Sequence, residues 1–281
     1  MENIICNIDS RFRDINSYKD SGLFTYKLNE PLKNIRYIRL SSIELPTLFY
    51  TFLQDYNNIS FQIITNDNVT HTIIIEEGNY DSTTIISQIQ SSLDLINEID
   101  NDNFVFSISW DSINYKISFT NKTPFTLIFD NDSNHRSLGD RLGFRLDNSN
   151  YLAADQITKF NIDVNMDLYY WTGETFLDIT KDNYIFLRVN DYGVIYNDVR
   201  NNTLLAKVIL YDQQFIIDTG ANFLTKAFNF KQPINISKLE IELVNALGQT
   251  INMNLINYSL TLEFGRIFDS NQFESKNFQV K

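Results

Sequence analysis

The chain has few of the residues that most catalytic and metal centres need. Its 281 residues include two histidines, His71 and His135, and a single cysteine, Cys6. One cysteine excludes a disulfide within the chain, and together with two histidines it excludes a zinc site built from histidine and cysteine ligands. We therefore expect no bound metal and no other cofactor.

Glycine and proline are also scarce, at nine and four residues. The two glycines of residues 137–144, SLGDRLGF, fit neither the Walker nor the Rossmann phosphate-binding spacing, and no Gly-x-Ser-x-Gly nucleophile elbow occurs. Acidic loops at residues 100–102 and 130–132 lack the EF-hand frame for calcium. These absences favour a protein that is not an enzyme. Paired carboxylates for glycoside hydrolysis remain an open alternative.

Basic residues are outnumbered by acidic ones, 23 to 35, which gives a formal net charge of −12. Such a surface repels nucleic-acid phosphates and anionic lipid, so we expect no nucleic-acid partner and no membrane docking. No run reaches the roughly 18 apolar residues of a membrane helix. Residues 1–14 lack the apolar core of a secretory signal.

Residues that favour β-strands are abundant. The chain has 22 Phe and 15 Tyr, and 43% of its residues are hydrophobic. A slip in the apolar alternation at Ser41-Ser42 predicts a bulge or bend, and Pro46 should end that strand. Period-two patterns predict strands at residues 23–28, 35–45, 61–65, 72–76, 160–164, 184–189, 204–211, 215–217, 226–230, 238–243 and 258–264.

The middle of the chain differs from the rest. Asp81 or Ser82 begins a predicted helix with an apolar stripe, and Asn66-Asp67-Asn68 predicts a hairpin turn before it. Strands at residues 104–110, 115–119 and 125–129 and a short helix within 137–144 should follow. The predicted fold is mainly β, a single jelly-roll β-sandwich with an inserted small α+β subdomain. Its jelly roll occupies residues 1–57, with an N-terminal arm, and 148–281, and its insertion occupies 58–147.

Residues 8–14, IDSRFRD, resemble the opening of capsid proteins from nucleocytoplasmic large DNA viruses, the giant viruses. Further segments resemble these proteins in the same order: 24–28, FTYKL; 35–40, IRYIRL; 42–46, SIELP; 77–80, EGNY; 142–144, LGF; 239–248; and 258–263, YSLTLE. The resemblance implies a penton or related minor capsid protein with one jelly roll. It implies a homopentamer that closes a five-fold ring, contacts other capsid proteins and resides in the virion after assembly in the host cytoplasm.

Four residues are interface candidates. Asp9, Arg11 and Arg13 could make charge-assisted contacts with an adjacent capsid protein, since the planar guanidinium of arginine pairs well with carboxylates. The alternative is that this segment is solvated or paired internally. Trp171, in the aromatic run at residues 169–171, could anchor an interface or pack in a core.

Other functions remain open at this point. An interstitial minor capsid or cement protein would use the same fold, and so would a β-sandwich adhesin that binds glycans. A hydrolase with paired acids is the third class.

Overall fold

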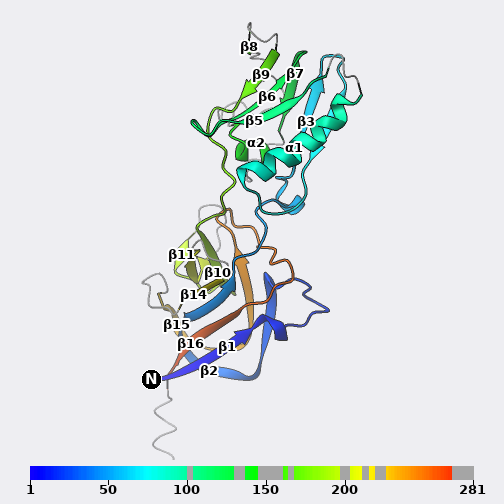
Figure 1. Cartoon of the computed structure of the whole chain (residues 1–281). Helices are drawn as coiled ribbons and strands as arrows, with labels where there is room; N and C mark the ends of the chain where they lie inside the picture. Colours follow the sequence, from blue (N-terminus) through cyan, green and yellow to red (C-terminus); the bar gives the residue numbers. More distant parts are fainter. Residues whose placement is uncertain are drawn as a thin grey trace, which may run out of the picture. The chain divides into compact units, whose positions relative to one another are not determined.

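A computed structural model describes residues 1–99, 104–129, 137–144, 161–163, 168–196, 203–210, 215–218 and 226–267. The chain divides into two compact units, of which the first is discontinuous and comprises Met1–Phe49 and Asp182–Lys281. The second unit, Tyr50–Lys181, interrupts it. Both are rich in antiparallel β-strands (Figure 1), which confirms the prediction of a mainly β fold.

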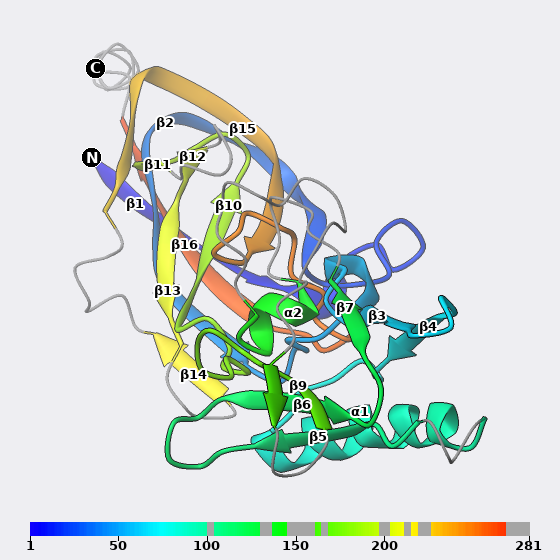
Figure 2. The ribbon, with the colours of Figure 1, turned by 90° about the horizontal axis from the view of Figure 1, so that it is seen from above.

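The first unit is built on one curled antiparallel sheet. The strands follow the order β1-β16-β2-β15-β10-β13, with β14 beside β2. The long strands β2 and β15 curve together (Figure 2), which gives the sheet a jelly-roll-like curl. The strands are β1 (Glu2–Asp9), β2 (Leu23–Pro46), β10 (Tyr184–Val189), β13 (Ala206–Ile209), β14 (Phe215–Asp218), β15 (Phe228–Val244) and β16 (Ser259–Arg266), with a separate pair β11 (Ile195–Tyr196) and β12 (Thr203–Leu204) and a 3-10 turn η1 (Ser10–Phe12).

Two predicted pairs of strands are each one continuous strand in the structure. The pattern separated residues 23–28 from 35–45 and residues 226–230 from 238–243, but β2 and β15 span these gaps. Pairing continues past Pro31 and Pro233 through shifts of register between β15 and β2. The predicted irregularity at Ser41-Ser42 is confirmed, because Thr261 pairs with Ser42 while Leu262 pairs with Leu40. Ser41 is thus the extra residue of a bulge.

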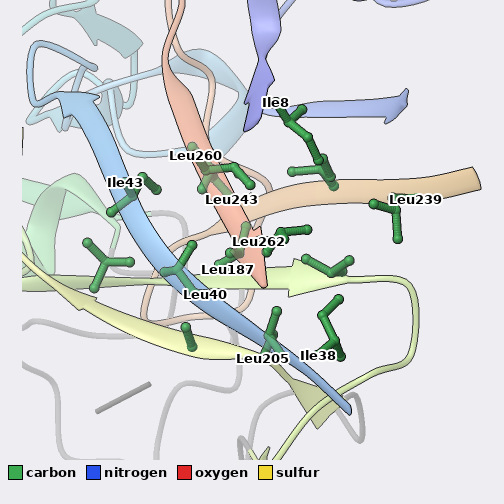
Figure 3. Close-up of a cluster of buried hydrophobic side chains, with 14 of the residues drawn as sticks. Ile8, Ile38, Leu40, Ile43, Leu187, Leu205, Leu239, Leu243, Leu260 and Leu262 are labelled. Atoms are coloured by element: carbon green, nitrogen blue, oxygen red, sulfur yellow. The ribbon is translucent and has the colours of Figure 1, made fainter. Parts of the chain in front are cut away.

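The core of the first unit lies inside this curl. Apolar side chains from β1, β2, β10, β15 and β16 point toward one another (Figure 3), and most are completely buried. They come from alternate positions of each strand, because successive side chains of a strand face opposite sides of the sheet.

The N-terminal segment is part of this sheet. Residues 1–14 were predicted as an arm, but Glu2–Asp9 forms β1 and pairs with β16 at eight consecutive positions. Ile8 of β1 is only 1% exposed. Burial of Ile8 and the continuous ladder hold this segment to its own subunit.

The second unit contains two sheets and a helix. One sheet comprises β3 (Ser60–Thr65), β4 (Thr70–Ile74) and β7 (Phe125–Ile128); the other comprises β5 (Ser107–Trp110), β6 (Ile117–Asn121), β9 (Leu168–Thr172) and β8 (Asn161–Asp163). Helix α1 (Ser82–Asn97) contacts β4 and β5, and the short elements η2 (Gln54–Tyr56) and α2 (Leu138–Arg141) complete the unit. The predicted order of elements within 58–147 is confirmed. The compact unit extends beyond that range, because β9 pairs with β6 and β8 pairs with β9.

Local sequence rules explain where α1 begins and which of its faces is buried. The Asp81 carboxylate accepts hydrogen bonds from the backbone N–H groups of Thr83 and Thr84, which closes a capping box. The predicted apolar stripe faces the core through its four buried members, Ile85, Ile89, Leu93 and Ile96. The fifth, Ile86, is half-buried.

Replacement of Ile8 should test whether β1 is structural. Ile8→Ala leaves a cavity in the closed core, so we expect a loss of about 2–4 kcal/mol in the free energy of unfolding. The matched change Ile15→Ala, at an exposed isoleucine of the same unit, should cost less than about 0.5 kcal/mol. Urea denaturation of both variants measures the difference. Equal, small losses would mean that β1 does not pack as described.

Candidate interaction site

Asp9 and Arg11 form an ion pair at the end of β1. The Asp9 carboxylate accepts hydrogen bonds from the Arg11 backbone N–H and from the Arg11 side chain, whose Nε lies 3.0 and 2.9 Å from the two carboxylate oxygens. The Arg11 guanidinium thereby holds the pKa of the Asp9 carboxyl below its usual range. The Arg11 side chain remains largely exposed, while that of Asp9 is mostly covered. A cationic group is therefore presented at a fixed position.

Arg13 is engaged within its own subunit. Its guanidinium donates to the carbonyl oxygens of Ser10, Tyr18 and Lys19 at 2.8, 3.0 and 2.6 Å, and to Oδ1 of Asn257 at 2.5 Å. These bonds tie the loop after η1 to the segment that enters β16. Arg13 therefore positions this corner, and of the two candidate arginines Arg11 is the one with an exposed side chain.

Besides the bonds of Arg13, a second set of hydrogen bonds joins the loop before β2 to the loop before β16. The Asp20 carboxylate accepts hydrogen bonds from the backbone N–H groups of Gly22, Met253 and Leu255 at 2.7, 2.9 and 3.1 Å. Ser21 donates to the carbonyl oxygen of Ile256 at 2.5 Å. The loops at residues 10–22 and 251–258 are thus held together at both ends.

A small pocket opens beside the Asp9–Arg11 pair. Its volume is about 290 Å³, and it is lined by Asp9, Arg11, Glu44, Asn257, Tyr258 and Ser259. Glu44 accepts a hydrogen bond from Ser259 at 3.2 Å. Burial raises the pKa of the Tyr258 hydroxyl, so this group stays protonated and cannot act as a base near neutral pH. The lining suits hydrogen bonds and ion pairs with polar side chains.

Exposed apolar side chains lie on the same two clamped loops. Phe12 is 81% exposed and Leu255 is 67% exposed, and Ile15 is also exposed. Because hydrogen bonds already hold these loops, their backbone loses little further freedom when a partner covers the apolar groups. With Arg11, they make this corner a candidate protein interaction site, called here the Arg11 corner. Its apolar members were not predicted from the sequence.

Trp171 lies in a core. It is 7% exposed, and its indole N–H donates to the carbonyl oxygen of Phe125 at 3.2 Å. Trp171 packs in the apolar cluster of the second unit. The sequence left open whether Trp171 anchors an interface or packs in a core, and its position here is that of a core residue.

The part of the chain that the structure describes holds no candidate metal-binding cluster. No three His, Cys, Asp or Glu side chains gather there closely enough to hold a metal ion. His71 lies on β4. His135 and the acidic loops at residues 100–102 and 130–132 lie outside the described residues. No helix within the described ranges combines the length and hydropathy that a membrane span requires.

The comparisons with known proteins include a likeness to a solved structure. The chain is similar to the crystal structure of the selenomethionine-labelled mavirus penton protein, with a TM-score of 0.44 and 13% identity, over 95% of this chain and 100% of that one. No protein-family model and no curated protein sequence matches the chain.

The pH response of Asp9 should report the Arg11 contact. Arg11→Gln removes the main cause of the lowered pKa, so the Asp9 carboxyl should titrate at a higher pH than in the unchanged protein. A lowered folded-state pKa stabilises the fold above the unfolded-state value of about 3.9, and this stabilisation disappears as the pH falls through the folded-state pKa. NMR titration of the carboxyl carbon measures the change.

Arg36→Gln is the matched control for this titration. Arg36 donates to the carbonyl oxygen of Lys231 and is not among the groups that shift the Asp9 pKa. Its replacement should leave the Asp9 titration unaltered. If Arg11→Gln also leaves it unaltered, the ion pair does not exist in solution.

Proposed function

We propose that this chain is a structural virion protein, a capsid vertex (penton) subunit that closes a five-fold ring and contacts neighbouring capsid proteins. The observation that carries the proposal is where the resembling segments lie. The segments at residues 8–14, 24–28 and 35–46 come from one end of the sequence, and those at 239–248 and 258–263 come from the other. They fall on or directly beside β1, β2, β15 and β16, four adjacent strands of one sheet. The segments at residues 77–80 and 142–144 lie in the second unit, but most of the resembling segments meet in one continuous sheet, which supports a shared architecture more strongly than scattered matches do.

The Arg11 corner supplies the contact with a neighbouring capsid protein. Arg11 presents a charge that can pair with a carboxylate of the neighbour, and Phe12 on the same loop and Leu255 on the bonded loop offer apolar area. Arg13 and Asp20 keep the two loops in place, so binding need not order them. Contacts in a five-fold ring are heterologous: each joins one surface of a subunit to a different surface of the next. The Arg11 corner can serve as one of these two surfaces.

The inserted unit provides a second contact surface. Ile113, Tyr115 and Phe176 are exposed, and the backbone N–H of Leu177 donates to the carbonyl oxygen of Tyr115 at 2.8 Å, which joins the two segments that carry these side chains. An exposed apolar group of this kind is typical of a protein contact. In this proposal the chain acts in the virion, after assembly in the host cytoplasm.

The copy number of the purified chain tests the vertex role. Native mass spectrometry should detect an assembly whose number of copies is a multiple of five. In cryo-electron microscopy of intact particles, density that fits the first unit should lie at the five-fold axes. Density between the axes would favour an interstitial capsid protein instead, and absence of the chain from purified particles would contradict a virion role altogether.

A charge reversal tests the Arg11 corner. Arg11→Glu should reduce incorporation of the chain into particles by about tenfold, because a broken charge contact costs about 1.4 kcal/mol or more. Lys33→Glu makes the same change of charge at another exposed site of the first unit and should have little effect. Quantitative mass spectrometry of purified particles measures both. Equal incorporation of the two variants would exclude the corner as a capsid contact.

A further inference from the structure

Strand β1 forms one outer edge of the sheet in the first unit. It pairs with β16 through eight positions without any shift of register, and none of the described residues pairs with its other side. Edge strands are usually protected against further pairing by lysine, proline, a bulge or short length. The opposite edge, β13, is four residues long and carries Lys207. β1, with the sequence ENIICNID, has none of these protections.

The backbone groups that β1 presents at its free edge can be assigned. The backbone N–H of Ser10 donates to the carbonyl oxygen of Tyr258, on the β16 side. Because successive residues of a strand direct their N–H and C=O groups to opposite sides, the even-numbered residues of β1 bond to β16. The N–H and C=O groups of Asn3, Ile5 and Asn7 therefore point outward, toward any strand that would extend the sheet.

The side chains of β1 alternate between two faces. Ile4, Cys6 and Ile8 face the core, where Ile4 and Cys6 are half-buried and Ile8 is buried, whereas Asn3 and Asn7 are exposed. Ile5 shares the exposed face and is 60% exposed. A partner strand must therefore offer apolar residues on one face and should cover Ile5 on the other.

The free edge carries little net charge although the chain is strongly acidic. Its two carboxylates already have arginine partners in the same subunit, with Glu2 3.3 Å from Arg266 and Asp9 bonded to Arg11. Charges elsewhere on a second copy are screened beyond about 8–10 Å at ordinary ionic strength. A second copy of this chain can therefore approach the edge without meeting an unpaired carboxylate.

We propose that β1 pairs antiparallel with β1 of a second copy, with Ile5 opposite Ile5 across a two-fold axis. Asn3 then lies opposite Asn7, and Ile4 opposite Cys6, so that apolar and polar faces continue from one subunit to the other. A shift by one residue would place Ile4 opposite Asn7 and join a core face to a solvent face. A shift by two would place Ile5 opposite Asn7 and leave it without an apolar partner. This contact is separate from the five-fold ring and does not depend on the proposed function.

Sedimentation velocity of the full chain over a range of concentrations tests the pairing. Ile5→Lys places two cations opposite each other at the centre of the ladder, and it should halve the number of copies in the largest species: from two to one, or from ten to five if the ring also forms. Asn7→Pro should do the same, since it removes an outward N–H and no backbone bond to β16; the side-chain bond from Thr261 to Asn7 is lost as well. Tyr196→Lys, at an exposed tyrosine of the first unit outside β1 and the Arg11 corner, should leave the number unchanged.

These results separate the inference from the capsid proposal. A wild-type chain that stays a single copy, or an assembly whose copy number Ile5→Lys and Asn7→Pro leave unchanged, overturns the pairing. Five copies in all variants would overturn it and leave the vertex role intact. Circular dichroism of each variant establishes that the fold is retained.

A disulfide cross-link tests the register. Residues 4 and 6 would form a non-hydrogen-bonded pair, with Cα atoms about 4.5 Å apart, within the range that a disulfide spans. Ile4→Cys, which keeps the native Cys6, should yield a covalent dimer on a non-reducing gel when diamide oxidises the two thiols. Ile4→Cys/Cys6→Ser lacks the facing thiol and should not. Equal yields from both, or no dimer from either, would overturn this register.

Discussion

The first unit depends on β2, an early strand that pairs with strands from the late part of the sequence. β2 pairs with β15, β16 and β14, and β16 in turn pairs with β1. This strand of 24 residues bends (Figure 2), and the bulge at Ser41 and the irregular pairing near Pro31 allow the bend. The same bend turns the apolar face of the sheet inward and closes the core. Residues from both ends of the sequence thereby meet in one layer.

The Arg11 corner follows from that arrangement. The register of β1 on β16 places Asp9 opposite Ser259, so that η1 leaves the sheet beside the loop that enters β16. Arg13 and Asp20 then bond across the two loops and fix them. The exposed groups of the corner, Arg11 and Phe12, stand on a base that is rigid before any partner binds. The proposed contact with a neighbour therefore rests on hydrogen bonds inside the subunit.

Features set by neighbouring residues could be predicted from the sequence, and features set by distant ones could not. The cap of α1 at Asp81 and the bulge at Ser41 depend on local patterns, and both were expected. β1 was not expected, because Ile5 is an apolar residue on the exposed face and obscures the period-two pattern of Ile4, Cys6 and Ile8. In the candidate site, Asp9 and Arg11 stood out by their charge and short spacing. Arg13 found its side-chain partner 244 residues away, at Asn257, where no local pattern could indicate it.

The pairing of β1 with β16 has a consequence for how the chain matures during synthesis. Glu2 and Arg266, which form an ion pair, are 264 residues apart in sequence. During synthesis β1 therefore stays without its partner strand, with both of its edges open, until the residues up to Arg266 have been made. The inserted unit is continuous in sequence and can complete its own sheets in the meantime. Contacts between such remote segments close slowly, so β1 passes through a period in which its unpaired edges make it a target for chaperones.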